Sequence, residues 1–309
     1  MQQSLRPVVV EPTEYFIEAN GLKFCVEERG NPNGPPIVLI MGLACQMISW
    51  PESLLNGLAA QGYRVIRFDN RDVGLTDKLQ SHVRVDIRLA FLFHKFGLKP
   101  RANYTLHDMA EDTACLMDAL GIDQAHVVGV SMGGMIAQLL ASHYRHKVAS
   151  LTAMMSSTNS ARLPLPEFSL MLKLGAPASG HHEKAVVKRW IRFWQAIQSP
   201  EYPTSLADVT GLVEAMYQRN YCAGGTLRQL QAILATGSLE QAISRIQVPT
   251  LVIHGSCDPL LKPACGKAIH RKVPGARFKL VRGLGHDLPE ALVPEFVSMI
   301  DGHAKDSVF

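Results

Sequence analysis

The chain has 309 residues, of which 47% are hydrophobic and 19% are charged, and its formal net charge is +4. This apolar fraction is enough to bury a large core, which excludes a disordered chain and a small domain held together by disulfides. The 31 Lys and Arg residues nearly balance the 27 Asp and Glu residues, and no basic stripe is present, so nucleic-acid binding is not favoured.

The first residues lack the basic start and the apolar core of a signal peptide. The longest apolar stretch, 36–45, is far shorter than the roughly 20 residues that span a bilayer. The six cysteines are scattered, without zinc-site spacing, which favours reduced thiols. We therefore expect a soluble, cytoplasmic protein that holds no metal, and membrane contact is not favoured.

Short β-rich runs alternate with helical patterns along the chain. A hairpin around Gly21 is predicted first, and six further strands follow, at 35–42, 64–69, 125–130, 148–155, 250–255 and 277–283. Helices are predicted at 51–61, 105–120, 132–145 and 287–300. This alternation predicts an α/β fold with a mostly parallel sheet and helices on both faces.

Two regions interrupt the alternation. Residues 158–245 contain helical patterns but no convincing buried strand, so they are predicted to form a helical cap inserted into a core of 1–157 and 246–309. Residues 77–103 contain an amphipathic basic segment, 85–99. A helix packed under the cap is the favoured interpretation of this segment, and membrane docking or a substrate gate is the alternative.

Ser131 is the candidate nucleophile. It lies in Gly-Val-Ser-Met-Gly at 129–133, between an apolar strand that ends at Val130 and a helix that starts at Met132. A G-x-S-x-G pattern alone is weak, but a serine at a strand-to-helix junction occupies a sharp turn that exposes its hydroxyl. The flanking glycines are needed because larger side chains would collide with the neighbouring strand and helix.

A serine hydroxyl needs a base to accept its proton, and a histidine suits that role. Among twelve histidines, His286 is the candidate because it follows the last predicted strand. Asp258 follows the 250–255 strand at the carboxyl edge of the sheet, so it is the candidate to orient the imidazole. We expect the N–H groups of Met132 and Leu43 to hold the oxyanion, with Ala44 as the alternative to Leu43.

Four segments resemble the α/β-hydrolase superfamily: 66–78, 129–134 (GVSMGG), 254–259 (HGSCDP) and 283–286 (GLGH). The resemblance covers nearly the whole chain, from about residue 15 to 302. The order Ser, Asp, His is that of the superfamily, and the segment FDNRDVGLT is similar to bacterial members near aclacinomycin methylesterases and enol-lactonases. The resemblance implies eight strands, with the cap after the sixth. Many relatives have His-Gly where this chain has Met41-Gly42, so the bracing of the oxyanion loop is expected to differ.

These residues predict a serine hydrolase that cleaves small to medium, largely apolar carboxylic esters without a cofactor. Lactone hydrolysis, perhydrolysis of the non-haem haloperoxidase type and C–C bond hydrolysis on the same three residues remain alternatives. A membrane-docked lipase and a non-catalytic binding protein are less favoured, and a homo-oligomer is left open. A serine nucleophile argues against an epoxide hydrolase or dehalogenase. The candidates for the substrate pocket are Met171, Leu174, Trp190, Phe193 and Trp194.

For two further groups of residues, a structural role is an alternative to contact with the substrate. Trp190 and Trp194 lie four residues apart on one helical face, which is also typical of packing within the cap. The charges at Asp69, Arg71 and Asp72 follow a buried strand. We expect them to form ion pairs that shape the rim of the active site rather than to contact the substrate.

Overall fold

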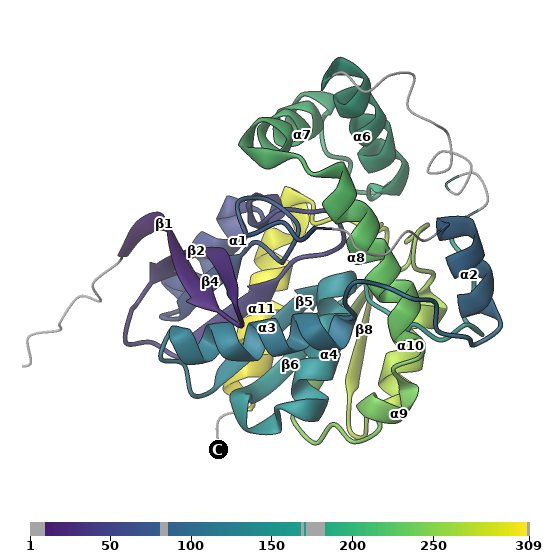
Figure 1. Cartoon of the computed structure of the whole chain (residues 1–309). Coiled ribbons are helices and arrows are strands. Elements are labelled where there is room, and N and C mark those ends of the chain that lie inside the picture. The colour runs from purple at the N-terminus through teal and green to yellow at the C-terminus, as the bar shows by residue number, and fades with distance from the viewer. Residues whose placement is uncertain (1–9, 81–85, 168–169, 171–182, 308–309) are drawn as a thin grey trace, which may run out of the picture.

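The computed structural model describes residues 10–80, 86–167, 170 and 183–307. A twisted sheet lies at the centre of the molecule (Figure 1). In the described residues it has eight strands: β1 (Val10–Ala19), β2 (Leu22–Gly30), β3 (Pro36–Ile40), β4 (Arg64–Phe68), β5 (Ala125–Val130), β6 (Val148–Met154), β7 (Thr250–Gly255) and β8 (Arg277–Val281).

The strand order is β1-β2-β4-β3-β5-β6-β7-β8. β1, β2 and β4 pair antiparallel, and every pairing from β4 to β8 is parallel. The β1–β2 hairpin turns at Asn20 and Gly21, whose φ angles of 47° and 71° are those of a tight hairpin turn. The predicted α/β sheet and its eight strands are therefore confirmed.

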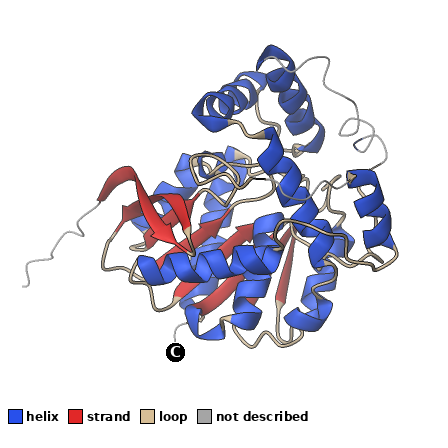
Figure 2. Ribbon diagram, in the orientation of Figure 1, coloured by secondary structure: helices blue, strands red, loops and turns tan. Residues whose placement is uncertain are grey.

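Helices cover both faces of the sheet (Figure 2). In the part of the chain that the structure describes, the α-helices are α1 (Glu52–Ala60), α2 (Ile87–Lys95), α3 (Leu106–Ala119), α4 (Met132–His143), α6 (Glu183–Ile197), α7 (Leu206–Asn220), α8 (Ala223–Thr236), α9 (Glu240–Ile243), α10 (Pro263–Lys272) and α11 (Val293–Lys305). α1 and α11 pack together on one face of the sheet, while α3 and α4 pack together on the other.

The sheet separates two apolar cores, because side chains along a strand point alternately to opposite faces. In β3, Val38 and Ile40 join the core under α3 and α4, whereas Ile37 and Leu39 join the core under α1 and α11. β5 is buried along its whole length, as its continuous apolar run predicts. The edge strand β8 is mostly exposed.

The helices between β6 and β7 differ in what they contact. α6 and α7 pack against each other and stand above the sheet in Figure 1, with a small apolar cluster between them. α8 packs against α2 and α3, and the short α9 packs against α4 and α10. The boundaries of the cap at 158 and 245 stay a prediction.

The predicted helix at 287–300 begins later than expected, at Val293. Pro289 precedes a short 3-10 turn at Glu290–Leu292, so the residues after His286 remain a loop. Within the described part of the chain, no helix is long and apolar enough to cross a membrane. All six cysteines are free thiols.

Candidate active site

Ser131 lies on a strained turn between β5 and α4. Its φ angle is 55°, in the left-handed region that a serine rarely adopts. The backbone holds this conformation: the Ser131 N–H donates to the carbonyl of Met154 at 2.9 Å, and the Ser131 carbonyl accepts from the hydroxyl of Ser156 at 2.8 Å. The strain is typical of a functional position rather than of ordinary packing.

Glycines on both sides of Ser131 make the turn possible. A Cβ atom at Gly129 would lie 2.3 Å from the carbonyl oxygen of Gly133, and one at Gly133 would lie 2.0 Å from that of Ile40. Both distances are impossible contacts with backbone atoms, so α4 approaches the sheet only because these side chains are absent. The predicted reason for the flanking glycines is confirmed.

His286 and Asp258 are joined by a short hydrogen bond. The Nδ1 of His286 lies 2.7 Å from Oδ2 of Asp258, and both side chains are buried. Because a carboxylate only accepts, Nδ1 is the donor, which leaves the lone pair of Nε2 available as a base. The other oxygen of Asp258 accepts from the backbone N–H groups of Leu260 and Leu261 at 2.9 and 2.8 Å.

A second histidine lies beside the same carboxylate. His254 Nε2 is 3.6 Å from Asp258 Oδ2 and hydrogen-bonds the carbonyl of Leu261 at 2.8 Å. Burial lowers the pKa of His254, which favours the neutral ring. No pattern in the sequence distinguishes this histidine from the others, because its proximity to Asp258 depends on the turn after β7.

The C-terminal end of α6 holds the loop that carries His286. The His286 N–H donates to the carbonyl of Ile197 at 2.8 Å, and the Gly285 N–H donates to the hydroxyl of Ser199 at 2.8 Å. Ser199 also bonds the carboxyl of Asp287, whose pKa is raised by burial. The position of His286 therefore depends on residues between β6 and β7 that no local pattern indicates.

The loop after β3 approaches Ser131 closely. A Cβ atom at Gly42 would lie 3.2 Å from Cβ of Ser131, so glycine permits this approach. The Ala44 N–H donates to Oε1 of the buried Gln229 at 2.9 Å. In the described part of the chain, the N–H groups of Leu43 and Met132 have no acceptor. This difference favours Leu43 over Ala44 as the free donor near Ser131.

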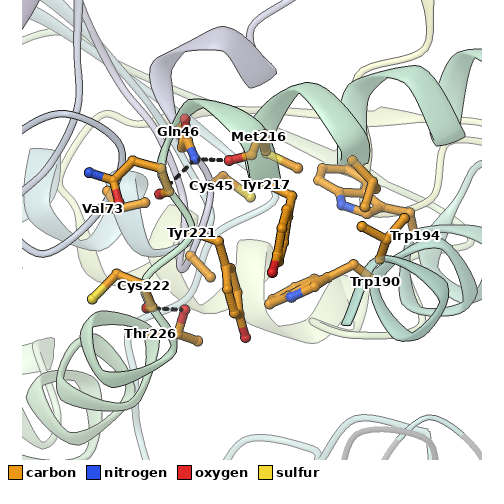
Figure 3. Close-up of a pocket in the computed structure, with 14 residues that line it drawn as sticks. Cys45, Gln46, Val73, Trp190, Trp194, Met216, Tyr217, Tyr221, Cys222 and Thr226 are labelled. Carbon is orange, nitrogen blue, oxygen red and sulfur yellow. Dashed lines mark hydrogen bonds between the residues drawn. The ribbon is translucent and has the colours of Figure 1, made fainter. Parts of the chain in front are cut away.

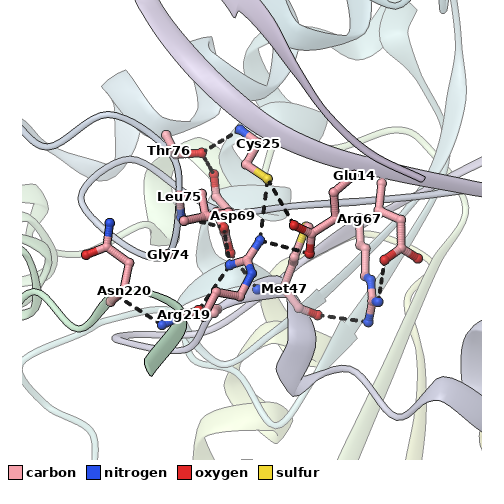
Figure 4. Close-up of polar contacts among 12 residues, drawn as sticks. Glu14, Cys25, Met47, Arg67, Asp69, Gly74, Leu75, Thr76, Arg219 and Asn220 are labelled. Atoms are coloured by element: carbon pink, nitrogen blue, oxygen red, sulfur yellow. Dashed lines mark hydrogen bonds and ion pairs between the residues drawn. The ribbon is translucent and has the colours of Figure 1, made fainter. Parts of the chain in front are cut away.

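The charged residues after β4 form buried ion pairs, as predicted, while their place at the rim of the active site stays a prediction. Asp69 pairs with Arg219 of α7 at 2.6 Å and accepts from the N–H groups of Met47 and Leu75 (Figure 4). Arg71 pairs with Asp112, and Asp72 pairs with Arg228 of α8 at 2.7 Å. These ion pairs connect the loop after β4 to α3, α7 and α8.

One large cavity brings the candidate residues together. Ser131, His286, Leu43 and Met132 all line it, and no hydrogen bond between the described side chains joins Ser131 to His286. Hydrogen bonds between catalytic groups are often longer in a free enzyme than in its substrate complex. Asp258 lies behind the ring of His286.

The pocket candidates on α6 also line this cavity. Trp190, Phe193 and Trp194 are among its walls, and the rings of Trp190 and Phe193 make an edge-to-face contact. Trp190 and Trp194 also line a smaller apolar pocket with the stacked pair Tyr217 and Tyr221 (Figure 3). Trp190 and Trp194 therefore both pack among the helices between β6 and β7 and line the cavity. Met171 and Leu174 lie outside the described residues.

Comparisons with known proteins agree with this architecture. Residues 35–290 match the family described as the alpha/beta hydrolase fold. The chain is 26% identical over 306 residues to a rhodomycin D methylesterase from Streptomyces sp. strain C5, covering 90% of this chain and 94% of that protein. It is also 26% identical over 261 residues to 3-oxoadipate enol-lactonase 1 from Acinetobacter baylyi, covering 84% of this chain and 85% of that protein.

The crystal structure of the enol-lactonase from Burkholderia xenovorans LB400 superposes with a TM-score of 0.72 at 21% identity, covering 94% of this chain and all of that chain. This likeness shows the fold. The family match covers more than half of the chain and confirms the resemblance that its motifs predicted. The chain therefore belongs to the α/β-hydrolase fold family and is an enzyme of its esterase-like branch.

Proposed function

We propose that this chain is a serine hydrolase that cleaves carboxylic esters through an acyl-enzyme intermediate, with Ser131 as nucleophile, His286 as general base and acid, and Asp258 as the residue that orients His286. The observation that carries the proposal is the 2.7 Å contact between His286 Nδ1 and Asp258, together with the strained Ser131, which lines the same cavity as His286. A base held in this way can accept the proton of an adjacent hydroxyl.

In the first half of the reaction, Ser131 Oγ attacks the ester carbonyl carbon while His286 Nε2 takes the hydroxyl proton. The carbonyl π electrons move to oxygen, and the N–H groups of Leu43 and Met132 stabilise the resulting oxyanion. When the oxyanion collapses, the ester C–O bond breaks. The leaving alkoxide takes the proton from His286 and departs as an alcohol.

In the second half, a water molecule attacks the acyl carbon and gives a proton to His286. Collapse of the second oxyanion breaks the bond to Ser131 Oγ, which recovers the proton as the carboxylic acid leaves. Asp258 keeps its charge throughout and stabilises the imidazolium that forms twice in each cycle. Its three hydrogen bonds keep it oriented while this charge appears.

The substrate is expected to be largely apolar, since Trp190, Phe193 and Trp194 contribute to the cavity wall. The cavity measures about 1920 Å³, more than the roughly 300–1,000 Å³ usual for a small-ligand pocket. Esters with a bulky acyl or alcohol group therefore belong in a substrate panel beside small ones. The similarity to a methylesterase over 90% of the chain makes methyl esters the first members of that panel.

Lactone hydrolysis is the second candidate. The same nucleophile opens a lactone ring, and the leaving alkoxide then stays attached to the acyl group. The observation that favours it is the 26% identity to an enol-lactonase over 84% of this chain. A panel that compares methyl esters with enol-lactones of similar size separates the two activities by their kcat/KM ratio.

A fluorophosphonate probe and a p-nitrophenyl ester test the proposal. Ser131→Ala is expected to lose labelling and at least about 1,000-fold of the esterase rate, because no other hydroxyl occupies the turn. Asp258→Asn is expected to lose about 1,000- to 10,000-fold in kcat, because an amide no longer fixes the tautomer of His286.

Ser160→Ala is the matched control, since this serine lines the same cavity but lies away from the strained turn. It is expected to retain labelling and most of the activity. Labelling or hydrolysis that survives in a folded Ser131→Ala variant would show that another residue is the nucleophile.

A further inference from the structure

One face of α2 is apolar and exposed. Four side chains at spacings of three, one and three residues form a continuous stripe over two helical turns. They are Leu89, Leu92, Phe93 and Phe96, which are 48%, 50%, 37% and 75% exposed and are called here the α2 stripe. None of the four belongs to an apolar cluster formed by the described residues. The α2 stripe therefore lies outside the apolar clusters of the described residues.

The concentration of these side chains is unusual. Of the ten large apolar side chains that are exposed in the described part of the chain, five lie between Leu89 and Leu98. Exposed apolar residues that are scattered singly are ordinary, whereas a contiguous apolar face on a helix indicates a surface that binds something. The helix itself is anchored, because Ala90 and His94 on its opposite face are buried and α2 packs against α8.

Positive charge surrounds the α2 stripe. Arg88 and Lys95 are seven residues apart and thus lie along one edge of it, while Lys99 and Arg101 follow the end of the helix. Arg88 and Lys95 also line the Ser131 cavity, and the Lys95 ammonium donates to the carbonyl of Ala161 at 2.9 Å. Residues 86–101 hold these four basic side chains and one acidic side chain, Asp86, which gives a net charge of +3. Asp86 is engaged as the N-cap of α2, where its carboxylate accepts from the Arg88 N–H at 2.8 Å.

The other side of α2 faces the Ser131 cavity. Ile87, Phe91 and His94 line that cavity, so one helix separates it from the exposed stripe. Any surface that binds the α2 stripe therefore lies about one helix diameter, roughly 10 Å, from the cavity wall.

We propose that the α2 stripe docks this enzyme on an anionic lipid surface. The four apolar side chains enter the boundary between head groups and acyl chains, while Arg88, Lys99 and Arg101 meet the lipid phosphates. A second copy of the chain fits less well, because a two-fold contact would bring two surfaces of charge +3 together. This docking lies beyond the proposed function and does not require Ser131.

Sedimentation of the full-length chain with lipid vesicles tests the proposal. Vesicles that contain phosphatidylglycerol are expected to bind the chain, vesicles of phosphatidylcholine alone to bind it much more weakly, and added salt to release it. Leu92→Glu and Phe96→Glu are each expected to lower the partition coefficient at least tenfold. Lys99→Glu combined with Arg101→Glu is expected to weaken binding to the anionic vesicles only.

Leu206→Glu on α7 and Leu280→Glu on β8 are matched controls, because these leucines are 58% and 42% exposed and lie on other elements. They are expected to bind vesicles like the natural chain, as is Ser131→Ala. The absence of binding to anionic vesicles, or an equal loss in Phe96→Glu and Leu206→Glu, overturns the proposal. A dimer that Leu92→Glu dissociates, without vesicle binding, would assign the stripe to self-association instead.

Discussion

At the scale of single residues, the turn beside Ser131 is held by an amide far away in the sequence. Gln229 is fully buried, accepts from the Ala44 N–H at 2.9 Å and donates to the carbonyl of Arg71 at 2.8 Å. Ala44 has a φ angle of 62°, which is strained for a residue with a side chain. We therefore expect Gln229 to act as a positioning residue that keeps the neighbouring Leu43 N–H in place.

Gln229→Leu is expected to lower kcat about 10- to 100-fold with little change in KM, because Ala44 can then relax and displace the Leu43 donor. This is less than the roughly 100- to 1,000-fold cost of deleting an oxyanion donor outright. Steady-state kinetics on a soluble ester, with active sites counted by fluorophosphonate labelling, measure the effect.

Adding Ala44→Gly to Gln229→Leu is expected to recover part of the lost rate, since glycine adopts a positive φ without strain. A simple loss of stability would instead lower the melting temperature and the number of active sites while leaving kcat per site unchanged. An unchanged kcat in folded Gln229→Leu contradicts the positioning role.

At the scale of elements, the junction of β5 and α4 depends on close packing against β3. Gly133→Ala would place a Cβ atom 2.0 Å from the carbonyl oxygen of Ile40, so either α4 or β3 must shift. We expect this variant to lose nearly all esterase activity and several kcal/mol of stability, or to fail to fold. Activity assays and thermal unfolding check it.

Gly302→Ala in α11 is the matched comparison, because nothing lies within 4 Å of a Cβ atom at that position. Replacing a glycine inside a helix is expected to raise the free energy of unfolding by about 0.5–1 kcal/mol. If the two variants behaved alike, contact with β3 would not be the reason for glycine at position 133.

At the scale of the whole molecule, a buried histidine couples stability to pH. His303 is 3% exposed, its Nδ1 lies 2.8 Å from the guanidinium of Arg277, and its Nε2 lies 3.1 Å from the carbonyl of Leu151. These partners require a neutral ring that accepts at Nδ1 and donates at Nε2. Burial, with a further contribution from Arg277, lowers the pKa of His303 to about 4.

The unfolded chain binds a proton at His303 near pH 6.5, whereas the folded chain does so only near pH 4, so stability falls as the pH drops through this window. By linkage, this one residue is expected to cost about 2 kcal/mol at pH 5 relative to pH 7.5. Urea unfolding at both pH values measures the difference.

His303→Gln keeps one acceptor and one donor but cannot take up a proton, so it is expected to reduce the pH dependence by that amount. His146→Gln, at an exposed position, is expected to leave the dependence unchanged. Equal pH dependence in the natural chain and in His303→Gln would assign the acid sensitivity to other groups.

The sequence by itself determined the α/β fold and the strands around β5, and it predicted the three candidate catalytic residues. Local chemistry is sufficient for these predictions: a continuous apolar run indicates a buried strand, and glycines around Ser131 indicate the turn. Asp258 and His286 could be placed because the carboxyl ends of parallel strands meet at one edge of the sheet.

Only the tertiary structure decided which donor near Ser131 is free, what holds the loop of His286 and which face of α2 is exposed. Gln229 and Ala44 are 185 residues apart, and no local sequence pattern predicts their contact. The pattern of segment 85–99 likewise predicts a helix with an apolar face and a basic face, but it does not predict which side of the helix is buried. The physical reason is that hydrophobic periodicity depends on neighbours within a few residues, whereas these contacts depend on how distant elements pack.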